Sequence, residues 1–443
     1  MGMVRSNRST NGDSIYIDSP LVRVVRALLG DGLPVAVTTY DGGYMGPADP
    51  PATVEVRGPD ALRRLLTAPG ELGFARAYVA GDLRLSGDIY AVLALRDRIP
   101  SPRLGPSEWV QLVRLLGSTG LKVLPAPAEE HHPSGRLHSL RRDRSAISHH
   151  YDVSNDFYEV ILGPAMTYSC AVFADEDTSL EDAQRAKLEL VCGKLALQPG
   201  RRLLDVGCGW GSMVMHAARY HGVEALGVTI SEEQAAWARD RVERAGLADK
   251  VEIRLCDYRE LGGERFDAIS SIGMSEHVGA ARMDDYFGAL AALLAPGGRL
   301  LNHAISRPPG SRPAIGRRTF VGRYVFPDGE LVEVGRVISS MQDAGLEAVH
   351  MESLREHYAR TLRRWVENLE RNWERCVELV GEPRARIWRL YMSGSALGFE
   401  EGRIAVNQVL GVPAGSTGVL PARPDWDTEA RWSDEVAQRV LRH

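Results

Sequence analysis

The feature that most constrains the fold is a glycine-rich turn that joins a buried strand to a helix. The apolar run RRLLDVG at 201–207 predicts a buried strand, and the turn at 205–211 reads DVGCGWG. The next residues, Ser212–His221, have the apolar spacing of a helix. Glycine lets the backbone turn tightly and pass close to a ligand, and a helix N-terminus offers free N–H groups. Ligands of open α/β sheets bind at the carboxyl ends of the strands, so this turn is a candidate binding site.

Strands and helices alternate around this turn, which predicts a parallel sheet covered by helices on both faces. A loop with several prolines follows Arg307 and leads into a predicted helical insertion. The expected strands are 201–207, 223–230, 251–257, 265–273, 296–305 and a closing strand at 403–412; the expected helices are 212–221, 232–245, 284–294, 355–380 and 384–401.

The sequence before residue 145 is expected to form three parts. Residues 1–18 are polar and are predicted to be a flexible N-terminus. Residues 19–100 alternate short apolar runs with turns, which predicts a small α+β domain. Residues 101–144 are rich in proline and arginine and are predicted to be a linker before a catalytic domain at 145–443. Within these parts we expect a strand at 53–58 and helices at 60–66, 72–78, 90–96 and 109–116.

Composition narrows the possible classes of protein. The formal net charge is only −5, so no overall field favours nucleic acid. The five cysteines form no CxxC pair, which argues against a disulfide scaffold and a structural zinc site and for a reducing cytosol. No run approaches the roughly 18 apolar residues of a membrane-spanning helix, and the first residues lack the apolar segment of a secretory signal. We therefore expect a cytoplasmic protein.

The turn DVGCGWG closely resembles motif I of class I S-adenosylmethionine methyltransferases. Its glycines are spaced more tightly than the GxGxxG of dinucleotide folds, and no GKS or GKT is present to bind phosphate. The resemblance implies an α/β, Rossmann-like fold with a mostly parallel seven-stranded sheet and a helical insertion, in addition to the small N-terminal domain. It also implies S-adenosylmethionine as the cofactor. The second strand departs from many class I enzymes, because it ends in Thr229-Ile230-Ser231 and not in an acid that grips the ribose.

Several further motifs fall in order along the chain and identify a narrower family. They are HYDVSNDFY, MTYSCAVF, GVTISEEQ, SSIGMSEHVG, LNHAIS and HYARTLRRW. Together they resemble the cyclopropane-fatty-acyl-phospholipid synthases, a family that includes the mycolic acid cyclopropane synthases, from about Ser145 to Leu410. The segment AYVAGDLRLSGDIY also looks like the leading domain of the longer bacterial members. These enzymes transfer a methyl group from S-adenosylmethionine to a cis double bond of a phospholipid acyl chain.

The chemistry of that reaction explains which residues it needs. An alkene is a weak nucleophile, so it has to be held in line with the methyl group in a dry pocket. Methyl transfer leaves a carbocation, which needs nearby negative or π-electron density. A base then removes a proton; loss from the new methyl group closes a cyclopropane, and loss of another proton gives a methylene branch.

The resemblance implies that a bound bicarbonate is this base. Glu276 would accept a hydrogen bond from bicarbonate and orient it, while His303 and Tyr358 would donate to it. Backbone N–H groups near Cys170 and Ile305 would complete the binding site. Each residue also has a structural interpretation: Cys170 as a small buried apolar residue, His303 as a hydrogen-bonded structural histidine, Glu276 as an acid at a helix N-terminus, and Tyr358 as part of a helix core.

The resemblance also carries over a set of cofactor contacts. Asp257 would bind the adenine amine, although it could instead cap the following turn. Tyr168 would face both the cofactor and the cation. The full set is Tyr168, Ser169, Asp205, Gly207, Gly209, Thr229, Gln234, Asp257, Tyr258 and Ile272.

Two departures from the family leave the product open. Ser395 stands where many relatives have a cysteine, and His357 stands where relatives often carry an acid. The segment at 393–410 looks more like actinobacterial members that make 10-methylene or 10-methyl stearate, so a branched product is expected at least as much as a ring. A saturated branch would require a separate reductase, because no nicotinamide or flavin motif is present.

The resemblance also suggests where the protein acts and with what. Its substrate would be an unsaturated acyl phospholipid, so we expect reversible, peripheral binding to the inner face of the membrane. The basic cluster at 136–144 is either a contact to that surface or a solvated linker. Related enzymes suggest a homodimer. The aromatic residues of the helical insertion are either part of an acyl tunnel or simple helix packing: Trp365, Trp373, Trp388, Tyr391 and Phe399.

Two other functions remain as alternatives. A catalytically silent lipid-binding relative would have lost Glu276, His303 or Cys170, and all three are present. A methyltransferase for nucleic acid would favour an Asn/Asp-Pro-Pro-aromatic motif after the fourth strand, where this chain has 273–277, GMSEH. A methyltransferase for another soluble molecule is the remaining possibility.

Overall fold

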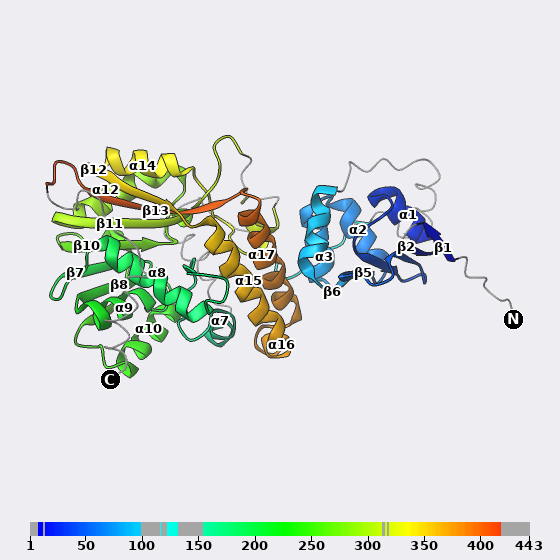
Figure 1. Ribbon diagram of the computed structural model, residues 1–443, viewed down its shortest axis with the longest axis horizontal. Helices are drawn as coiled ribbons and strands as arrows, with labels where there is room; N and C mark the ends of the chain where they lie inside the picture. The colour runs from blue at the N-terminus through cyan, green and yellow to red at the C-terminus, as the bar shows by residue number, and fades with distance from the viewer. Residues whose placement is uncertain are drawn as a thin grey trace. The chain divides into compact units, whose positions relative to one another are not determined.

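The chain forms two compact units in a computed structural model that describes residues 8–11, 14–98, 116, 122–131, 154–311, 315–316 and 319–417. The first unit comprises residues 1–131 with 318–320 and 381–394, and the second comprises 132–317, 321–380 and 395–443. Figure 1 labels their helices and strands. No helix of the described residues is both long enough and apolar enough to span a membrane.

The first unit is an α+β structure around a six-stranded mixed sheet, as the sequence predicts. The strand order is β1-β2-β4-β3-β5-β6, and only the β3–β5 pair is parallel. Its elements are β1 (Arg8–Asn11), β2 (Ser14–Ile17), α1 (Pro20–Leu29), β3 (Ala36–Thr39), β4 (Tyr44–Pro47), β5 (Ala52–Val56), α2 (Pro59–Thr67), α3 (Glu71–Val79), β6 (Leu83–Gly87), α4 (Ile89–Leu93) and a 3-10 turn, η1 (Ala94–Arg98).

The structure corrects three predicted boundaries. Residues 8–11 and 14–17 are strands of this sheet, so the flexible segment predicted at 1–18 is wrong for them. Residues 122–131 belong to the first unit, where Glu130 forms an ion pair with Arg76 at 2.7 Å. Residues 381–394, predicted to be catalytic domain, also group with the first unit, and Arg386 there donates to the Tyr78 carbonyl at 3.2 Å. The predicted helix at 109–116 lies outside the described residues except for its last residue, Leu116, and the basic cluster at 136–144 lies outside them entirely.

The second unit has a seven-stranded sheet in the order β12-β13-β11-β10-β7-β8-β9. The pairs among β11, β10, β7, β8 and β9 are parallel, whereas β13 runs antiparallel to both β11 and β12. This is the class I methyltransferase fold that the sequence predicts. Its strands are β7 (Arg202–Val206), β8 (Glu224–Thr229), β9 (Val251–Leu255), β10 (Phe266–Ile272), β11 (Leu294–Ser306), β12 (Leu346–Ser353) and β13 (Ala405–Pro413).

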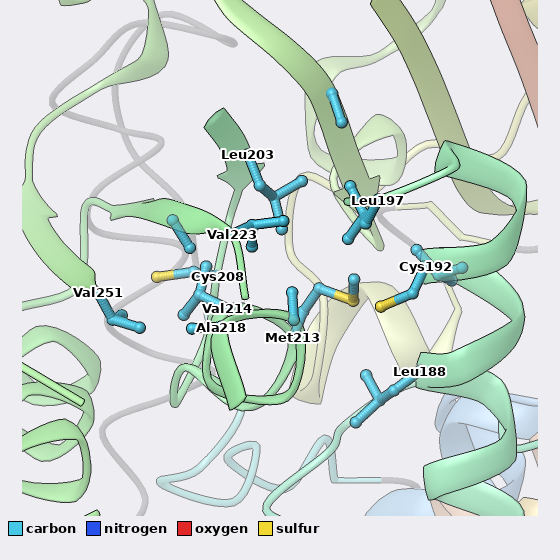
Figure 2. Packing of buried hydrophobic residues seen from close by; sticks show 14 of the residues in the cluster. Leu188, Cys192, Leu197, Leu203, Cys208, Met213, Val214, Ala218, Val223 and Val251 are labelled. Atoms are coloured by element: carbon cyan, nitrogen blue, oxygen red, sulfur yellow. The ribbon is translucent and has the colours of Figure 1, made fainter. Parts of the chain in front are cut away.

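Helices pack on both faces of this sheet, with α8, α9 and α10 on one face and α12 and α14 on the other. The helices after residue 154 are α7 (Asn155–Leu162), α8 (Leu180–Leu195), α9 (Ser212–His221), α10 (Glu232–Arg244), α11 (Ser275–Val278), α12 (Met283–Leu293), α13 (Phe320–Tyr324), α14 (Val334–Asp343), α15 (Arg355–Arg371), α16 (Trp373–Val380) and α17 (Glu382–Glu400), with 3-10 turns η3 (Tyr258–Glu260) and η4 (Ala280–Arg282). The part of α17 up to residue 394 groups with the first unit. Consecutive strand residues serve opposite faces: Leu203 packs with α8, α9 and α10, whereas Leu204 packs with α12 and α14. Figure 2 shows the first of these two cores.

Local sequence signals explain several helix starts. Ser179 caps α8 by accepting from the Asp182 N–H, and Ser231 caps α10 by accepting from the Gln234 N–H. The helix α8 precedes the first predicted strand and was not predicted, and neither were α14 and β12. The missed α8 matters most, because it packs along the sheet beneath the predicted site.

Candidate active site

The glycine turn at the end of β7 has the backbone geometry that a close ligand requires. Gly207 has φ +76° and its N–H donates to the Val228 carbonyl at 2.9 Å. A Cβ at Gly207 would lie only 2.3 Å from Met274 Sδ, so this position has no room for a side chain. Gly209 also has a positive φ, +53°, but a Cβ there would meet nothing within 4 Å. The turn therefore presents open backbone at Gly209, and the segment is the one expected to lie against the methionine part of the cofactor.

Polar groups at the ends of β8 and β9 flank this turn. Thr229 Oγ1 donates to Gln234 Oε1 at 2.9 Å, which fixes the amide of Gln234 at the start of α10. Asp257 accepts from the Arg259 N–H at 3.0 Å and from its guanidinium at 2.7 Å. The alternative expected for Asp257, a turn cap, is thus present, and adenine binding by this residue stays a proposal.

The other predicted cofactor residues lie on neighbouring elements. Asp205 is buried on β7 and accepts from Ser270 Oγ at 2.6 Å; burial raises the pKa of Asp205 to about 6 despite that hydrogen bond. Tyr258 packs edge-on against Tyr286, with 5.2 Å between ring centroids. Ile272 ends β10 directly beside His303 of β11.

Ser169 contacts a buried lysine that the sequence analysis missed. Lys187 of α8 is 1% exposed and its Nζ donates to Ser169 Oγ at 3.0 Å. Burial lowers the pKa of Lys187 to about 8, while the nearby Cys170 and Asp205 oppose that shift. No carboxylate pairs with this ammonium among the described residues. A buried cation without a paired anion is costly, so its position beside a predicted binding residue is notable.

Glu276 is held by one carboxylate oxygen only. Its Oε1 accepts from the Ile305 N–H at 2.7 Å, whereas its Oε2 is enclosed and has no hydrogen-bond partner. Burial raises the pKa of Glu276 to about 7 even though the Ile305 N–H opposes the shift. The amide of Ile305 therefore orients Glu276 and is not free for a ligand, which revises the direct role expected for it.

The tautomer of His303 follows from a chain of hydrogen bonds behind it. Lys194 Nζ donates to Gln408 Oε1 at 2.7 Å, since an ammonium group can donate hydrogen bonds but cannot accept them. The amide nitrogen of Gln408 then lies 3.1 Å from His303 Nδ1 and donates to it. Burial lowers the pKa of His303 to about 3, with nearby Lys187 and Lys194 adding to the effect, so the ring is neutral. A neutral ring that accepts at Nδ1 carries its proton on Nε2, which is enclosed and has no partner.

Hydrogen bonds through Leu354 link Cys170 and Tyr358 to the strand that pairs with Ile305. The Leu354 carbonyl accepts from the Tyr358 N–H at 3.0 Å and lies 3.6 Å from Cys170 Sγ. The Leu354 N–H donates to Val406 at 2.9 Å, and Val406 is opposite Ile305 in the sheet. Burial raises the pKa of the Cys170 thiol well above its usual range, which favours the neutral thiol.

Aromatic rings line the same region. Trp365, fully buried on α15, lies 5.3 Å from Tyr168 and 6.1 Å from Tyr358, measured between ring centroids. Phe399 lies 4.7 Å from Tyr358. Such rings supply the π-electron density expected around a carbocation. Trp388 and Tyr391, in contrast, group with the first unit and pack on each other.

The structure gives one of the two family departures a local role. His357 Nδ1 accepts from the Phe173 N–H at 3.1 Å and its ring stacks on Phe173. His357 therefore fixes the segment that carries Cys170. Ser395 is half-buried on α17, and nothing in the structure explains its difference from the relatives.

Comparisons with known proteins point to one family. Residues 138–409 match the family model described as mycolic acid cyclopropane synthetase. A probable fatty acid methyltransferase of Mycobacterium tuberculosis is 45% identical over 406 residues, which cover 89% of this chain and 95% of that protein. A tuberculostearic acid methyltransferase of the same organism is 36% identical over 387 residues, covering 85% of this chain and 87% of the relative.

A solved structure agrees with these matches. A mycolic acid cyclopropane synthase in complex with S-adenosylhomocysteine and the detergent CTAB is 33% identical, with a TM-score of 0.57. The match covers 60% of this chain and 97% of that one.

Proposed function

Since the chain belongs to the mycolic acid cyclopropane synthetase family and is an S-adenosylmethionine-dependent fatty acid methyltransferase, we propose that it methylates the cis double bond of an unsaturated acyl chain in a phospholipid. We further propose that a bicarbonate ion held by Glu276 and His303 is the base. The product that we propose is a methylene-branched chain of the 10-methylene stearoyl type, with a cyclopropane as the alternative.

One observation carries the proposal of a bound base. Glu276 Oε2 can accept and His303 Nε2–H can donate, and both atoms are enclosed without a partner. Burying such groups unpaired costs about 1–3 kcal/mol each, so a protein retains them where a ligand satisfies them. Bicarbonate has both a hydroxyl donor and oxygen acceptors, which matches this pair.

Different residues of the chain would bind the cofactor and the base. S-adenosylmethionine supplies an electrophilic methyl group when it is bound. Gly209 leaves space beside the turn, Gly207 lets the turn pack closely against Met274, and Thr229, Gln234 and Asp257 flank it. Glu276 and His303 would hold the bicarbonate, whose role is to take the proton.

The rings around the site would stabilise the cation and exclude water. Trp365, Tyr168 and Tyr358 pack against one another, and Phe399 extends this wall on Tyr358. π-electron density facing a cation contributes about 2 kcal/mol or more when the site is dry. A dry pocket also prevents water from capturing the carbocation.

The setting of the reaction stays a proposal. The acyl chain of a phospholipid lies in a bilayer, so the enzyme would bind the inner membrane surface reversibly from the cytoplasm, as a homodimer. A saturated methyl branch would need a separate reductase, since reduction of a methylene group consumes two electrons that methyl transfer does not supply.

The test is to incubate the enzyme with labelled S-adenosylmethionine and oleoyl phospholipid vesicles and to analyse the acyl chains by mass spectrometry and NMR. We expect a mass gain of one CH₂ and the NMR signals of an exocyclic methylene. Cyclopropane signals would select the alternative product. Methylation of the head group, or no transfer to the lipid, would contradict the proposed function.

The bicarbonate proposal needs its own measurement. Enzyme depleted of carbonate should be slow and should recover its rate when bicarbonate is added. A rate that does not respond to bicarbonate would remove the ion from the mechanism while leaving the methyl transfer intact.

A further inference from the structure

A second cluster of ligand-type side chains lies between α8 and α9, outside the site described above. Cys192 comes from α8, and His216 and His221 come from α9. One ring nitrogen of each histidine and the Cys192 Sγ all lie within 4.8 Å of one another. Figure 2 shows the Cys192 side chain directed from α8 toward α9.

A carboxylate completes the cluster. Glu189 Oε2 lies 3.1 Å from His216 Nε2 and 3.0 Å from His221 Nε2. Glu189 precedes Cys192 by three residues on α8, so the two side chains share one face of that helix.

The spacing is close to that of a metal centre. With Zn–N near 2.0–2.1 Å and Zn–S near 2.3 Å, the donor atoms of a tetrahedral site are separated by about 3.3–3.8 Å. The three donors lie within roughly one ångström of that separation, a shift that side-chain rotation can supply. Cys192 and His216 are buried and His221 is largely so, which limits competition from water.

We propose that Cys192, His216 and His221 form a binding site for a late first-row transition metal ion of the zinc type, with Glu189 offsetting its charge. Two imidazoles and a thiolate suit zinc, cobalt or copper, whereas magnesium and calcium prefer oxygen ligands. The ion would join α8 to α9. The absence of CxxC pairs argued against a structural zinc site, but these ligands come together only when the two helices pack.

A metal-free arrangement accounts for part of the cluster. Two neutral histidines can both donate to one carboxylate oxygen, and that satisfies Glu189 without an ion. In that arrangement Cys192 is an apolar member of the core between α8 and α9, and its thiol makes no hydrogen bond within the described part of the chain. Metal binding would take the thiol proton and replace the S–H bond by an S–metal bond, so one proton is released to solvent for each ion bound.

The experiment uses the full chain stripped of metal with a chelator. Zinc is titrated in competition with a chromophoric chelator, and cobalt is titrated separately because a thiolate ligand gives a charge-transfer band. We expect one ion per chain, that band with cobalt, and a higher Tm with zinc. Cys192→Ala and His221→Gln should each weaken binding at least about tenfold and lose the gain in Tm.

Cys376→Ala is the matched control, because Cys376 is a fully buried thiol on another helix, α16. It should bind zinc like the unchanged protein. If Cys192→Ala does not fold, His221→Gln carries the test, since His221 lies near the surface at the end of α9. Equal binding by the unchanged protein and His221→Gln, or no stoichiometric binding by the unchanged protein, overturns the proposal.

Discussion

The helix α8 carries two buried lysines, and their surroundings differ in a way that separates structure from function. Lys194 Nζ pairs with the Glu352 carboxylate and donates to Gln408. Lys187, about two turns earlier, donates to the Ser169 hydroxyl, its one hydrogen bond within the described residues. Both side chains are almost fully buried. The Lys194 ammonium thus has a carboxylate and an amide oxygen as partners, and we call its surroundings the closed region. The Lys187 ammonium has a hydroxyl acceptor and no carboxylate partner among the described residues, and we call its surroundings the open region.

The open region contains the other unpaired atoms of the site. Glu276 Oε2, His303 Nε2 and Trp365 Nε1 are all enclosed without partners. Closed polar networks rigidify a fold, and unpaired buried groups are retained where a ligand completes them. The comparison predicts that substitutions in the open region reduce activity more than stability. Substitutions in the closed region should mainly reduce stability, or reduce activity indirectly by changing the orientation or tautomer of His303.

The largest effect is expected for Glu276→Gln. The amide keeps the shape of the side chain but removes the charge and one acceptor position. We expect kcat to fall about 10³-fold, with cofactor affinity and Tm unchanged. Methyl transfer to lipid and calorimetric titration with S-adenosylhomocysteine measure the two quantities, and a normal rate would exclude Glu276 from the mechanism.

Gln408→Glu tests the closed region through the proton of His303. A carboxylate at this position still accepts from Lys194 but can only accept from the histidine, so it draws the proton to Nδ1 and leaves Nε2 without one. We expect kcat to fall about 100-fold in a folded protein. NMR of the imidazole nitrogens reports the tautomer directly; full activity with the reversed tautomer would contradict the assigned role of Nε2–H.

Lys194→Met should mainly lower stability. It leaves Glu352 and Gln408 without their donor, and Glu352 is about one third exposed, so the free energy of unfolding should fall by about 1–3 kcal/mol. Denaturant unfolding measures the change. An unchanged midpoint would show that the closed region does not contribute to the fold.

Lys187→Met, in contrast, should not lower the free energy of unfolding in the same assay. Removing an unpaired buried charge should leave the free energy of unfolding unchanged or raise it by about 1 kcal/mol, while kcat/KM falls about tenfold. Lys187→Arg keeps the charge and should restore part of the activity. If Lys187→Met lowers the free energy of unfolding as much as Lys194→Met does, the proposed difference between the two lysines is wrong.

The smallest effect is expected in the pH profile. Burial raises the pKa of Glu276 to about 7, so the accepting carboxylate form grows as pH rises through 7. Burial lowers the pKa of Lys187 to about 8, so the ammonium is lost as pH rises through 8. We expect kcat/KM, with bicarbonate saturating, to be greatest between about pH 7 and 8. A profile that is flat from pH 6 to 9 would exclude both groups.

The linkage of these two groups to stability follows the same shifts. The folded-state pKa of Glu276 is raised, so its contribution to stability is present below its unfolded pKa of about 4 and is lost as pH rises through about 7. The folded-state pKa of Lys187 is lowered, so it stabilises the fold above its unfolded pKa of about 10 and that contribution is lost as pH falls through about 8.

Local patterns were sufficient for the fold and for part of the site. The apolar runs and the glycine turn predicted β7, α9 and the strands that follow, because each depends on neighbours in sequence. Glu276 and His303 were found through the family motifs that contain them. The exceptions are α8, β12 and α14. The strand β12 has no regular alternation, whereas α14 carries Val334, Val337, Ile338 and Met341 at helical spacing, a signal that the sequence analysis did not use.

The residues that contact the predicted site from behind, Lys187, Lys194 and Gln408, could not be predicted from local patterns. Lys194 meets Gln408 and Glu352 across 214 and 158 residues of sequence, and no local pattern encodes such contacts. One signal was available: Lys187 and Lys194 are seven residues apart on the apolar stripe of α8, where a lysine is out of place. Polar residues within an apolar stripe mark positions worth inspecting.

The bond between Ile305 and Glu276 has a consequence for how such enzymes diversify. The backbone N–H of residue 305 donates the hydrogen bond to the Glu276 carboxylate. Every residue except proline has this N–H, so the hydrogen bond does not depend on the side chain at position 305. Substitutions at 305 other than proline should therefore keep the hydrogen bond that orients Glu276, so the side chain at this position can change while the carboxylate stays in place.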